Sequence, residues 1–212
     1  MLFGLSFLEL IIRLAALIVA FTVHELSHGL MAYMLGDKTA KNDGRLTLNP
    51  MRHIDPMGLL FLMFFSFGWA KPVMVDPRNF QYPKQDMALT AVAGPLSNFL
   101  LAFVTTMISF PLLISGSPLL SGSLGMFLNF MIGINLALGI FNLLPIPPLD
   151  GSKLFGAILP DRAYFSFISM GSRYGMILLL ILIATNQLVP IIRTIHDFAF
   201  DMLFNIARFI YT

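Results

Sequence analysis

Long apolar segments are the feature of this sequence that most restricts its fold. The first runs from about Leu5 to Leu35, and further ones cover about 87–114, 124–144 and 163–185. A helix of about 20 apolar residues crosses the hydrocarbon core of a bilayer. The chain is 57% hydrophobic and only 11% charged, so it has too few polar groups to cover this surface in water. The sequence therefore predicts an all-α polytopic membrane protein with about four transmembrane helices.

Composition also excludes several classes of protein. The net charge is +2, which is too small to indicate nucleic-acid binding. The chain has no cysteine, which rules out disulfides, thiolate metal sites and a cysteine nucleophile. The first basic residue is Arg13, so the N-terminal apolar run lacks the charged start of a signal peptide and is predicted to stay as a membrane helix. We find no internal repeat and expect a single domain over 1–212.

The region between the first two apolar segments has a different character. Turn residues are frequent there, and Arg45 to Leu48 alternate between polar and apolar, which favours short strands. Met57 to Phe67 is apolar but too short to cross a bilayer. We therefore expect a first helix over 5–36, then a small membrane-associated β-sheet and a re-entrant or interfacial segment over 37–85.

The C-terminal stretch, 189–211, is predicted to be an amphipathic helix. Its polar residues recur every four positions and form one stripe on an apolar helix: Arg193, Asp197, Asp201 and Asn205. Such a helix either lies in the membrane interface or covers the helical bundle.

Basic residues predict the orientation in the membrane. The region 37–85 holds 7 of the 13 lysines and arginines, and the loop 115–123 holds none. By the positive-inside rule, the first faces the cytoplasm and the second the exterior. The sequence thus predicts a multi-pass protein of the cytoplasmic membrane with its N-terminus outside.

An HExxH motif lies inside the first apolar segment, with His24, Glu25 and His28 as its polar members. Residues four apart share a helix face, so both imidazoles can bind one zinc ion, with the glutamate as general base. The histidines lie about 12–18 Å from the helix end at Gly36, at 1.5 Å per residue. Ionisable groups at such a depth indicate function, and the site is nearer the cytoplasmic face.

A catalytic zinc ion needs a third protein ligand. Asp150 is the best placed carboxylate, because it follows the proline-rich break after the third apolar segment and lies on the same side of the membrane. The alternative is that Asp150 caps the N-terminus of the next helix.

Three motifs in this order resemble the site-2 protease family of intramembrane zinc metalloproteases. They are His24-Glu25-Leu26-Ser27-His28, Gly94-Pro95-Leu96-Ser97-Asn98, and the stretch from Asn142 through Pro145, Pro147 and Pro148 to Asp150-Gly151. Intervening segments resemble its compact bacterial branch: Gly44 to Pro50, His53 to Pro56 and Gly68 to Val73. The resemblance covers about 20–156. Unlike in larger members, we expect no span before the HExxH helix and no PDZ or CBS domain.

The resemblance implies roles for individual residues. It implies that His24, His28 and Asp150 bind zinc and that Glu25 activates water. It also implies that Asn142 contacts the substrate or the developing oxyanion, although Asn142 could instead cap backbone carbonyls near the prolines.

The remaining polar residues have simpler interpretations. Asn98 and Asn135 are interpreted first as packing residues or supports of the metal ligands, with substrate binding as the further prediction for Asn98. His53 is predicted to make structural hydrogen bonds, and His196 to belong to the polar stripe.

These features predict a zinc-dependent intramembrane endopeptidase that cuts a transmembrane segment of another membrane protein. An edge strand at 44–49 or 71–75 could pair with the unwound substrate. Two alternatives remain: an inactive homologue that binds membrane helices, and a metal or ion transporter, although a transporter would favour inverted repeats. The substrate and the oligomeric state are left open.

Overall fold

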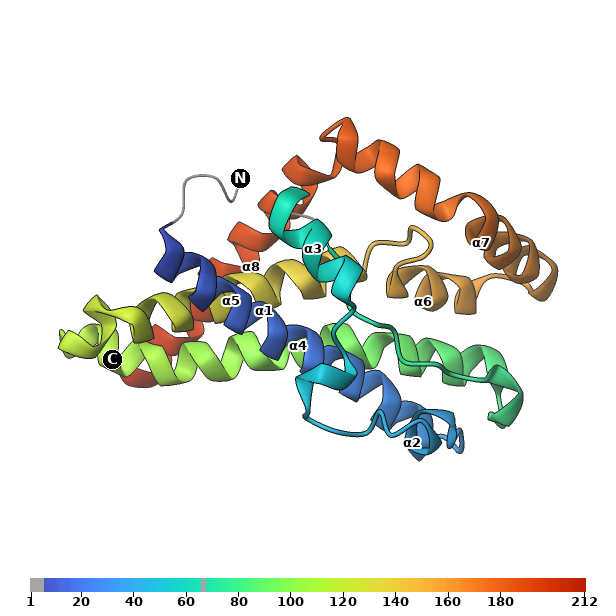
Figure 1. The fold of residues 1–212 in the computed structure, drawn as a ribbon, viewed down its shortest axis with the longest axis horizontal. Helices are drawn as coiled ribbons and strands as arrows, with labels where there is room; N and C mark the ends of the chain where they lie inside the picture. Colours follow the sequence, from blue (N-terminus) through green and yellow to red (C-terminus); the bar gives the residue numbers. More distant parts are fainter. Residues whose placement is uncertain (1–5, 66–67) are drawn as a thin grey trace.

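The fold is seen in a computed structural model that describes residues 6–65 and 68–212 (Figure 1). The described residues are mostly helical. The helices have the following bounds: α1 Phe7–Met34, α2 Thr39–Asn42, α3 Pro56–Phe65, α4 Pro83–Ile114, α5 Ser123–Asn142, α6 Asp150–Ile158, α7 Asp161–Ala184 and α8 Leu188–Tyr211. Short 3-10 turns lie at Pro50–Arg52, Pro77–Asn79 and Pro118–Ser121.

The first helix begins at a capping box. The Ser6 hydroxyl accepts the Glu9 amide, and the Glu9 carboxylate accepts the Ser6 amide at 2.7 Å. These two bonds satisfy backbone donors that a helix start would otherwise leave free. The helix then continues for 28 residues to Met34, within the predicted 5–36, of which residue 5 lies outside the described part.

Three helices are long and apolar enough to cross a membrane, namely α1, α4 and α5. They pack against one another and form the elongated bundle of Figure 1. The fourth predicted span corresponds to α7, which is bent by 63° between Asp161–Gly171 and Arg173–Ala184. The prediction of an all-α polytopic protein is therefore confirmed, with three candidate spans, or four if the bent pair counts as one.

The loop between α5 and α6 is held by close contact with α7. A Cβ atom on Gly171 would lie 2.5 Å from the Pro147 ring, and one on Gly175 would lie 2.5 Å from the Pro147 carbonyl oxygen. Side chains larger than hydrogen would push α7 away from this loop. The two glycines therefore support the backbone that leads into Asp150.

Helix α8 covers the bundle. Leu203 packs with Ala102 of α4 and with Ile132 and Leu136 of α5 in one buried cluster. The four residues of the predicted polar stripe are exposed on the opposite side. Of the two positions considered for this helix, the structure therefore has the one against the bundle.

The predicted β-sheet is wrong. Within residues 6–65 and 68–212 there is no strand, and the β-type pairing found there is one isolated antiparallel bridge between Ile54 and Ala70. Prolines at 50, 56, 72 and 77 remove backbone donors that a ladder would need. The alternating stretch that favoured strands instead turns back on itself, since the Thr47 amide donates to the Arg45 carbonyl at 3.0 Å.

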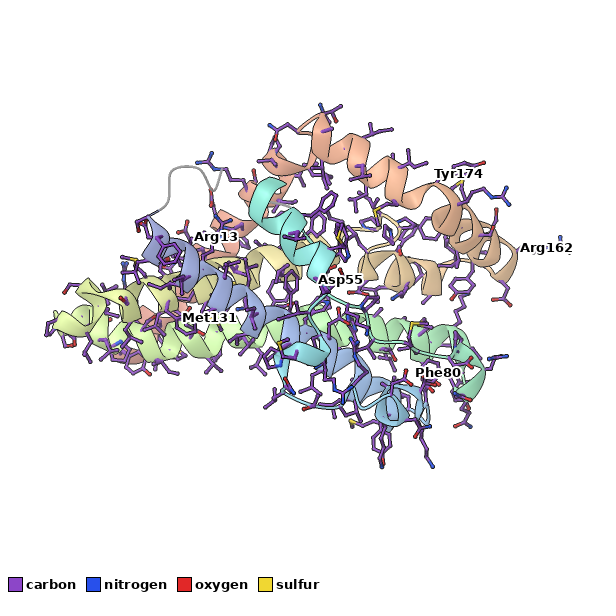
Figure 2. All side chains as sticks on the ribbon, in the orientation of Figure 1. Arg13, Asp55, Phe80, Met131, Arg162 and Tyr174 are labelled. Atoms are coloured by element: carbon purple, nitrogen blue, oxygen red, sulfur yellow. The ribbon has the colours of Figure 1, made fainter. Side chains whose placement is uncertain are left out.

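The short apolar segment predicted at 57–67 forms helix α3. The helix has 10 residues, which is about 15 Å of rise, so it is too short to cross a hydrocarbon core of about 30 Å. Asp55 lies where α3 begins (Figure 2) and its carboxylate accepts the Gly58 amide at 2.9 Å. Residues 66–67 of the predicted segment lie outside the described part.

Residues 71–76 form what we call the strap, an extended chain that leads from α3 towards α4 (Figure 1). At its first residue, the Lys71 amide donates a hydrogen bond to the His53 carbonyl at 2.8 Å. The Lys71 carbonyl accepts a hydrogen bond from the Arg45 guanidinium. Its last residue, Asp76, donates its amide to the buried Asp37 carboxylate at 2.8 Å. Side chains of the loop after α1 therefore fix both ends of the strap.

Candidate metal centre

Three buried side chains converge between α1 and the start of α6. The Nε2 atoms of His24 and His28 are 3.0 Å apart, and Asp150 Oδ2 lies 3.3 Å from the first and 3.1 Å from the second. All three residues are less than a tenth exposed. Among the described residues they form the one group of three or more histidine and acidic side chains whose ligand atoms could hold a metal ion.

Hydrogen bonds on the far side of each imidazole fix its protonation. His24 Nδ1 lies 2.6 Å from Asn98 Oδ1, and His28 Nδ1 lies 2.7 Å from the Thr90 carbonyl. The Asn98 amide nitrogen already donates to Asn135 and to the Ala20 carbonyl, so its oxygen faces His24. Both Nδ1 atoms therefore donate, and both Nε2 atoms turn a lone pair towards Asp150.

This arrangement fits a tetrahedral zinc ion. Two imidazole lone pairs and a carboxylate oxygen repel one another unless a cation lies between them. Zinc bonds of about 2.0–2.1 Å in tetrahedral geometry place neighbouring ligand atoms about 3.3 Å apart. The three separations of 3.0, 3.1 and 3.3 Å match that spacing, so the residues present fit the metal.

Asp150 is not the N-cap of α6. Leu149 holds the cap position, and the Asp150 side chain points instead at the histidines. Its second oxygen, Oδ1, lies 3.3 Å from Lys153 Nζ. Burial by itself would raise the pKa of Asp150, but the polar groups close to its carboxylate, the Lys153 ammonium among them, hold that pKa well below its usual range. The carboxylate is therefore ionised and available as a ligand.

The neighbouring glycine explains how α4 comes so close to the centre. A Cβ atom on Gly94 would lie 2.4 Å from His28 Nε2 and 2.7 Å from His24 Cε1. Real Cβ atoms do not make contacts this short, so only glycine fits beside the two rings. The glycine of the Gly-Pro motif thus makes room for both imidazoles.

Glu25 lies between the two histidines on α1 and is half-buried. Its Oε2 accepts the amide of Val73 in the strap at 2.8 Å. Its other oxygen has no hydrogen-bond partner among the described residues. The strap therefore holds one side of the carboxylate and leaves the other available.

The remaining predicted residues lie as follows. Asn142 ends α5 and donates its amide to the Leu138 carbonyl at 3.0 Å, so no hydrogen bond links it to the three-residue cluster. Asn135 joins the cluster indirectly, through Asn98. His53 is fully buried and lies 2.8 Å from the Thr47 carbonyl, and His196 lies beside Asp197. Both histidines stand outside the metal group.

Three contacts of the centre were not predicted from the sequence: the Thr90 carbonyl, the Val73 amide and Lys153. Two of them are backbone groups, which carry no residue signal at all. Lys153 could have been found, because a lysine three residues after Asp150 on a helix lies on the same face.

Comparisons with known proteins find relatives that are named as zinc metalloproteases. The family model described as peptidase family M50 matches residues 106–182. The chain is 41% identical over 172 residues to a Bacillus subtilis protein named putative zinc metalloprotease YwhC, covering 80% of this chain and 78% of that one. It is 33% identical over 150 residues to the putative zinc metalloprotease MJ0611 of Methanocaldococcus jannaschii, covering 70% and 71%. No solved structure gives a significant match.

Proposed function

The chain belongs to peptidase family M50, the site-2 protease family, and we propose that its three-residue cluster holds the zinc ion of an intramembrane endopeptidase. Its reaction is zinc-dependent hydrolysis of a peptide bond. The observation that carries the residue assignment is the approach of His24 Nε2, His28 Nε2 and Asp150 Oδ2 to within 3.3 Å of one another. The two alternatives, an inactive homologue and a transporter, are not favoured.

Different residues of the chain have different roles in the hydrolysis. His24, His28 and Asp150 would hold a zinc ion, which would supply Lewis-acid chemistry for the attacking water and the peptide carbonyl. Glu25 accepts the proton of the attacking water and returns a proton to the leaving amine. The Val73 amide keeps one oxygen of Glu25 in place, so the free oxygen performs the transfer.

Two asparagines support the reaction in different ways. Asn98 acts as a positioning residue, because its Oδ1 fixes the tautomer and the ring orientation of His24. It is fully buried, which favours this role over the substrate contact predicted for it. Asn142 remains the candidate donor to the developing oxyanion, for which its amide must leave the Leu138 carbonyl.

Asp150 offers a direct test of the zinc assignment. Purified protein with Asp150→Ala should lose most of its zinc, because the ion keeps only two protein ligands. The matched control is Asp197→Ala, which removes an exposed aspartate from α8 and should keep wild-type zinc content. Equal zinc in both variants, measured by plasma emission spectrometry, would refute the ligand set.

The substrate is a transmembrane segment of another membrane protein in this proposal. Its helix must unwind before the peptide bond can be attacked, and unwinding exposes polar backbone groups that are costly in lipid. Successive amides of an extended chain point to opposite sides. Because the Val73 amide points at Glu25, the Met74 amide points away from α1, and it has no partner among the described residues. The outer edge of the strap can therefore pair with the unwound substrate.

Of the two candidate edges, the strap is the one we retain. The 44–49 segment is bent, since the Arg45 amide bonds the Ala40 carbonyl and the Thr47 amide bonds the Arg45 carbonyl. It offers no extended edge.

A proline at residue 74 tests the edge. Met74→Pro removes the outward amide donor and should lower cleavage of a single-span substrate at least about tenfold. This is the effect expected when a buried carbonyl of the substrate loses one hydrogen bond between uncharged groups. Met74→Ala keeps the amide and serves as the control. Zinc content should be unchanged in both variants. Cleavage by Met74→Pro at the wild-type rate would refute strand pairing.

We further propose that the end of the bundle carrying the strap and α6 faces the cytoplasm. The basic residues of 37–85 lie at that end. The metal ligands lie about 9–15 Å from the end of α1 at Met34, at 1.5 Å per residue, so water needs to enter only from that side.

A further inference from the structure

A basic pocket lies on the loops between α1 and α4, separate from the three-residue metal cluster. Its volume is about 500 Å³, and its lining includes Arg45, Arg52 and Lys71, with Asp43 as the one acid. Small-molecule sites occupy about 300–1,000 Å³. Three positive charges against one negative charge make the pocket suited to an anion.

Arg45 is the part of this pocket that calls for an explanation. It is only 6% exposed, and its Nε has no hydrogen-bond partner among the described residues. One terminal nitrogen donates to the Lys71 carbonyl. Burial lowers the pKa of Arg45, against the attraction of the Glu25 and Asp43 carboxylates. A buried guanidinium with a free donor is costly, so its charge is only partly compensated within the chain.

The other two basic residues are also without acidic partners. Arg52 and Lys71 are exposed, and none of the three basic residues forms an ion pair within the part of the chain that the structure describes. Exposed arginines elsewhere do pair, as Arg78 does with Asp76 at 2.7 Å. The three charges therefore converge on one pocket, and none of them is neutralised by an ion pair among the described residues.

The rim of the pocket is apolar. Met51 is 75% exposed and Met74 is 63% exposed, and both line the pocket. Leu48, on the same loop, is 68% exposed. Apolar side chains next to basic ones are typical of a surface at the level of lipid headgroups, where the acyl chains and the phosphates meet.

The position of the pocket agrees with that level. Its two loops lie against α1 at Gly29, where a Cβ atom would be 2.8 Å from the Leu46 side chain and 3.5 Å from that of Val73. Gly29 lies about 8 Å from the end of α1 at Met34, at 1.5 Å per residue. The pocket thus opens where a candidate span leaves the apolar part of the bilayer.

We propose that this pocket binds the phosphate group of an anionic phospholipid, with Arg45 at its base, Arg52 and Lys71 at its sides, and the exposed methionines against the acyl chains. A free phosphate ion would use the same charges but not the methionines. An acidic segment of a protein would not need the apolar rim. The combination therefore favours a lipid.

The test is a lipid titration of the full chain in neutral detergent, followed by native mass spectrometry. The probes are dioctanoyl phosphatidylglycerol, dioctanoyl phosphatidylcholine and inorganic phosphate. Wild type should bind phosphatidylglycerol at least tenfold more tightly than phosphatidylcholine. The double variant Arg52→Gln, Lys71→Gln should lose about 25-fold in phosphatidylglycerol affinity, taking about fivefold for each charge.

Controls separate this site from general charge effects. Arg162→Gln removes one exposed positive charge at the start of α7 (Figure 2) and should change the affinity less than twofold. The double variant changes only exposed side chains, so the test does not depend on whether a protein without the buried Arg45 folds. Binding is measured directly, and the result is independent of proteolysis.

Four results would overturn the proposal. Equal affinity for the two lipids, or an equal loss in Arg162→Gln, would show that the pocket selects no headgroup. Inorganic phosphate that binds as tightly as phosphatidylglycerol would make it a site for a free anion. Displacement of the lipid by a water-soluble acidic peptide would make it a peptide site.

Discussion

Single atoms around the two histidines decide whether they can share one metal ion. Gly94 leaves room on the Nε2 side, and Asn98 and the Thr90 carbonyl hold the Nδ1 side. Each ring is thus fixed from both directions. The same logic explains why a Gly-Pro pair and an asparagine occur together on α4.

These two supports predict the effect of two substitutions. Gly94→Ala places a Cβ atom 2.4 Å from His28 Nε2, and Asn98→Leu removes the acceptor for His24 Nδ1. Each should weaken zinc binding about 10–100-fold, the usual effect of losing the support of a metal ligand. Competition with a zinc chelator measures the affinity.

Matched controls exist on α5. Gly133→Ala meets only His196, at 3.9 Å, and Asn129→Leu changes an exposed asparagine. Both should bind zinc like the wild type. Wild-type affinity in Gly94→Ala and Asn98→Leu would mean that the two supports are dispensable.

The sequence predicted the candidate metal ligands better than it predicted the groups that hydrogen-bond to them. The spacing of His24 and His28 on one helix predicted two ligands, and the proline break pointed to Asp150. The partners of the two Nδ1 atoms lie 74 and 62 residues away along the chain, and one of them is a backbone carbonyl. Only the packing of α4 on α1 brings them into contact.

Among the elements, the strap connects the fold to the chemistry. Its amides bond to side chains of α1 and of the loop that follows, through Glu25 and Asp37. It is therefore held by two carboxylates instead of by a neighbouring strand. The strap therefore forms no strand of the predicted sheet in the described part of the chain.

Asp37 should matter for stability. It is fully buried and accepts the amides of Thr39 and Asp76 and the side chain of Asn79. Asp37→Asn turns an amide group towards donors that then lose their acceptor, so we expect a loss of about 1–3 kcal/mol in the free energy of unfolding. Thermal unfolding in detergent measures it, with the exposed Asp43→Asn as the control. A variant as stable as the wild type would refute this role.

The same residue predicts a pH dependence. Burial by itself would raise the pKa of Asp37, but hydrogen bonds from Thr39, Asn79 and the Asp76 amide outweigh it and lower the pKa. The unfolded value is about 3.9. The stability from Asp37 is therefore complete above about pH 4 and is lost as the pH falls through the lower folded pKa. Asp37→Asn should lack this acid-dependent part of the unfolding curve.

For the whole molecule, apolar composition predicted the class of fold and the HExxH motif predicted the chemistry. The approximate lengths of the membrane helices could be predicted from the apolar segments, because a segment that crosses lipid must satisfy its own backbone hydrogen bonds. The position of α8 could not be predicted from the sequence, since the same amphipathic pattern fits a helix in the membrane interface and a helix on the surface of a bundle. Contacts of Leu203 with α4 and α5 decide it in the structure.

In the proposed mechanism, one zinc ion and Glu25 together hydrolyse a peptide bond inside a membrane protein. Zinc content and cleavage of a panel of single-span substrates should be measured for purified wild type and for Glu25→Gln. Glu25→Gln keeps the three ligands and removes the base. We expect about one zinc ion per chain in both proteins and cleavage by the wild type alone. Undiminished cleavage by Glu25→Gln, or no zinc in the wild type, would rule out this mechanism.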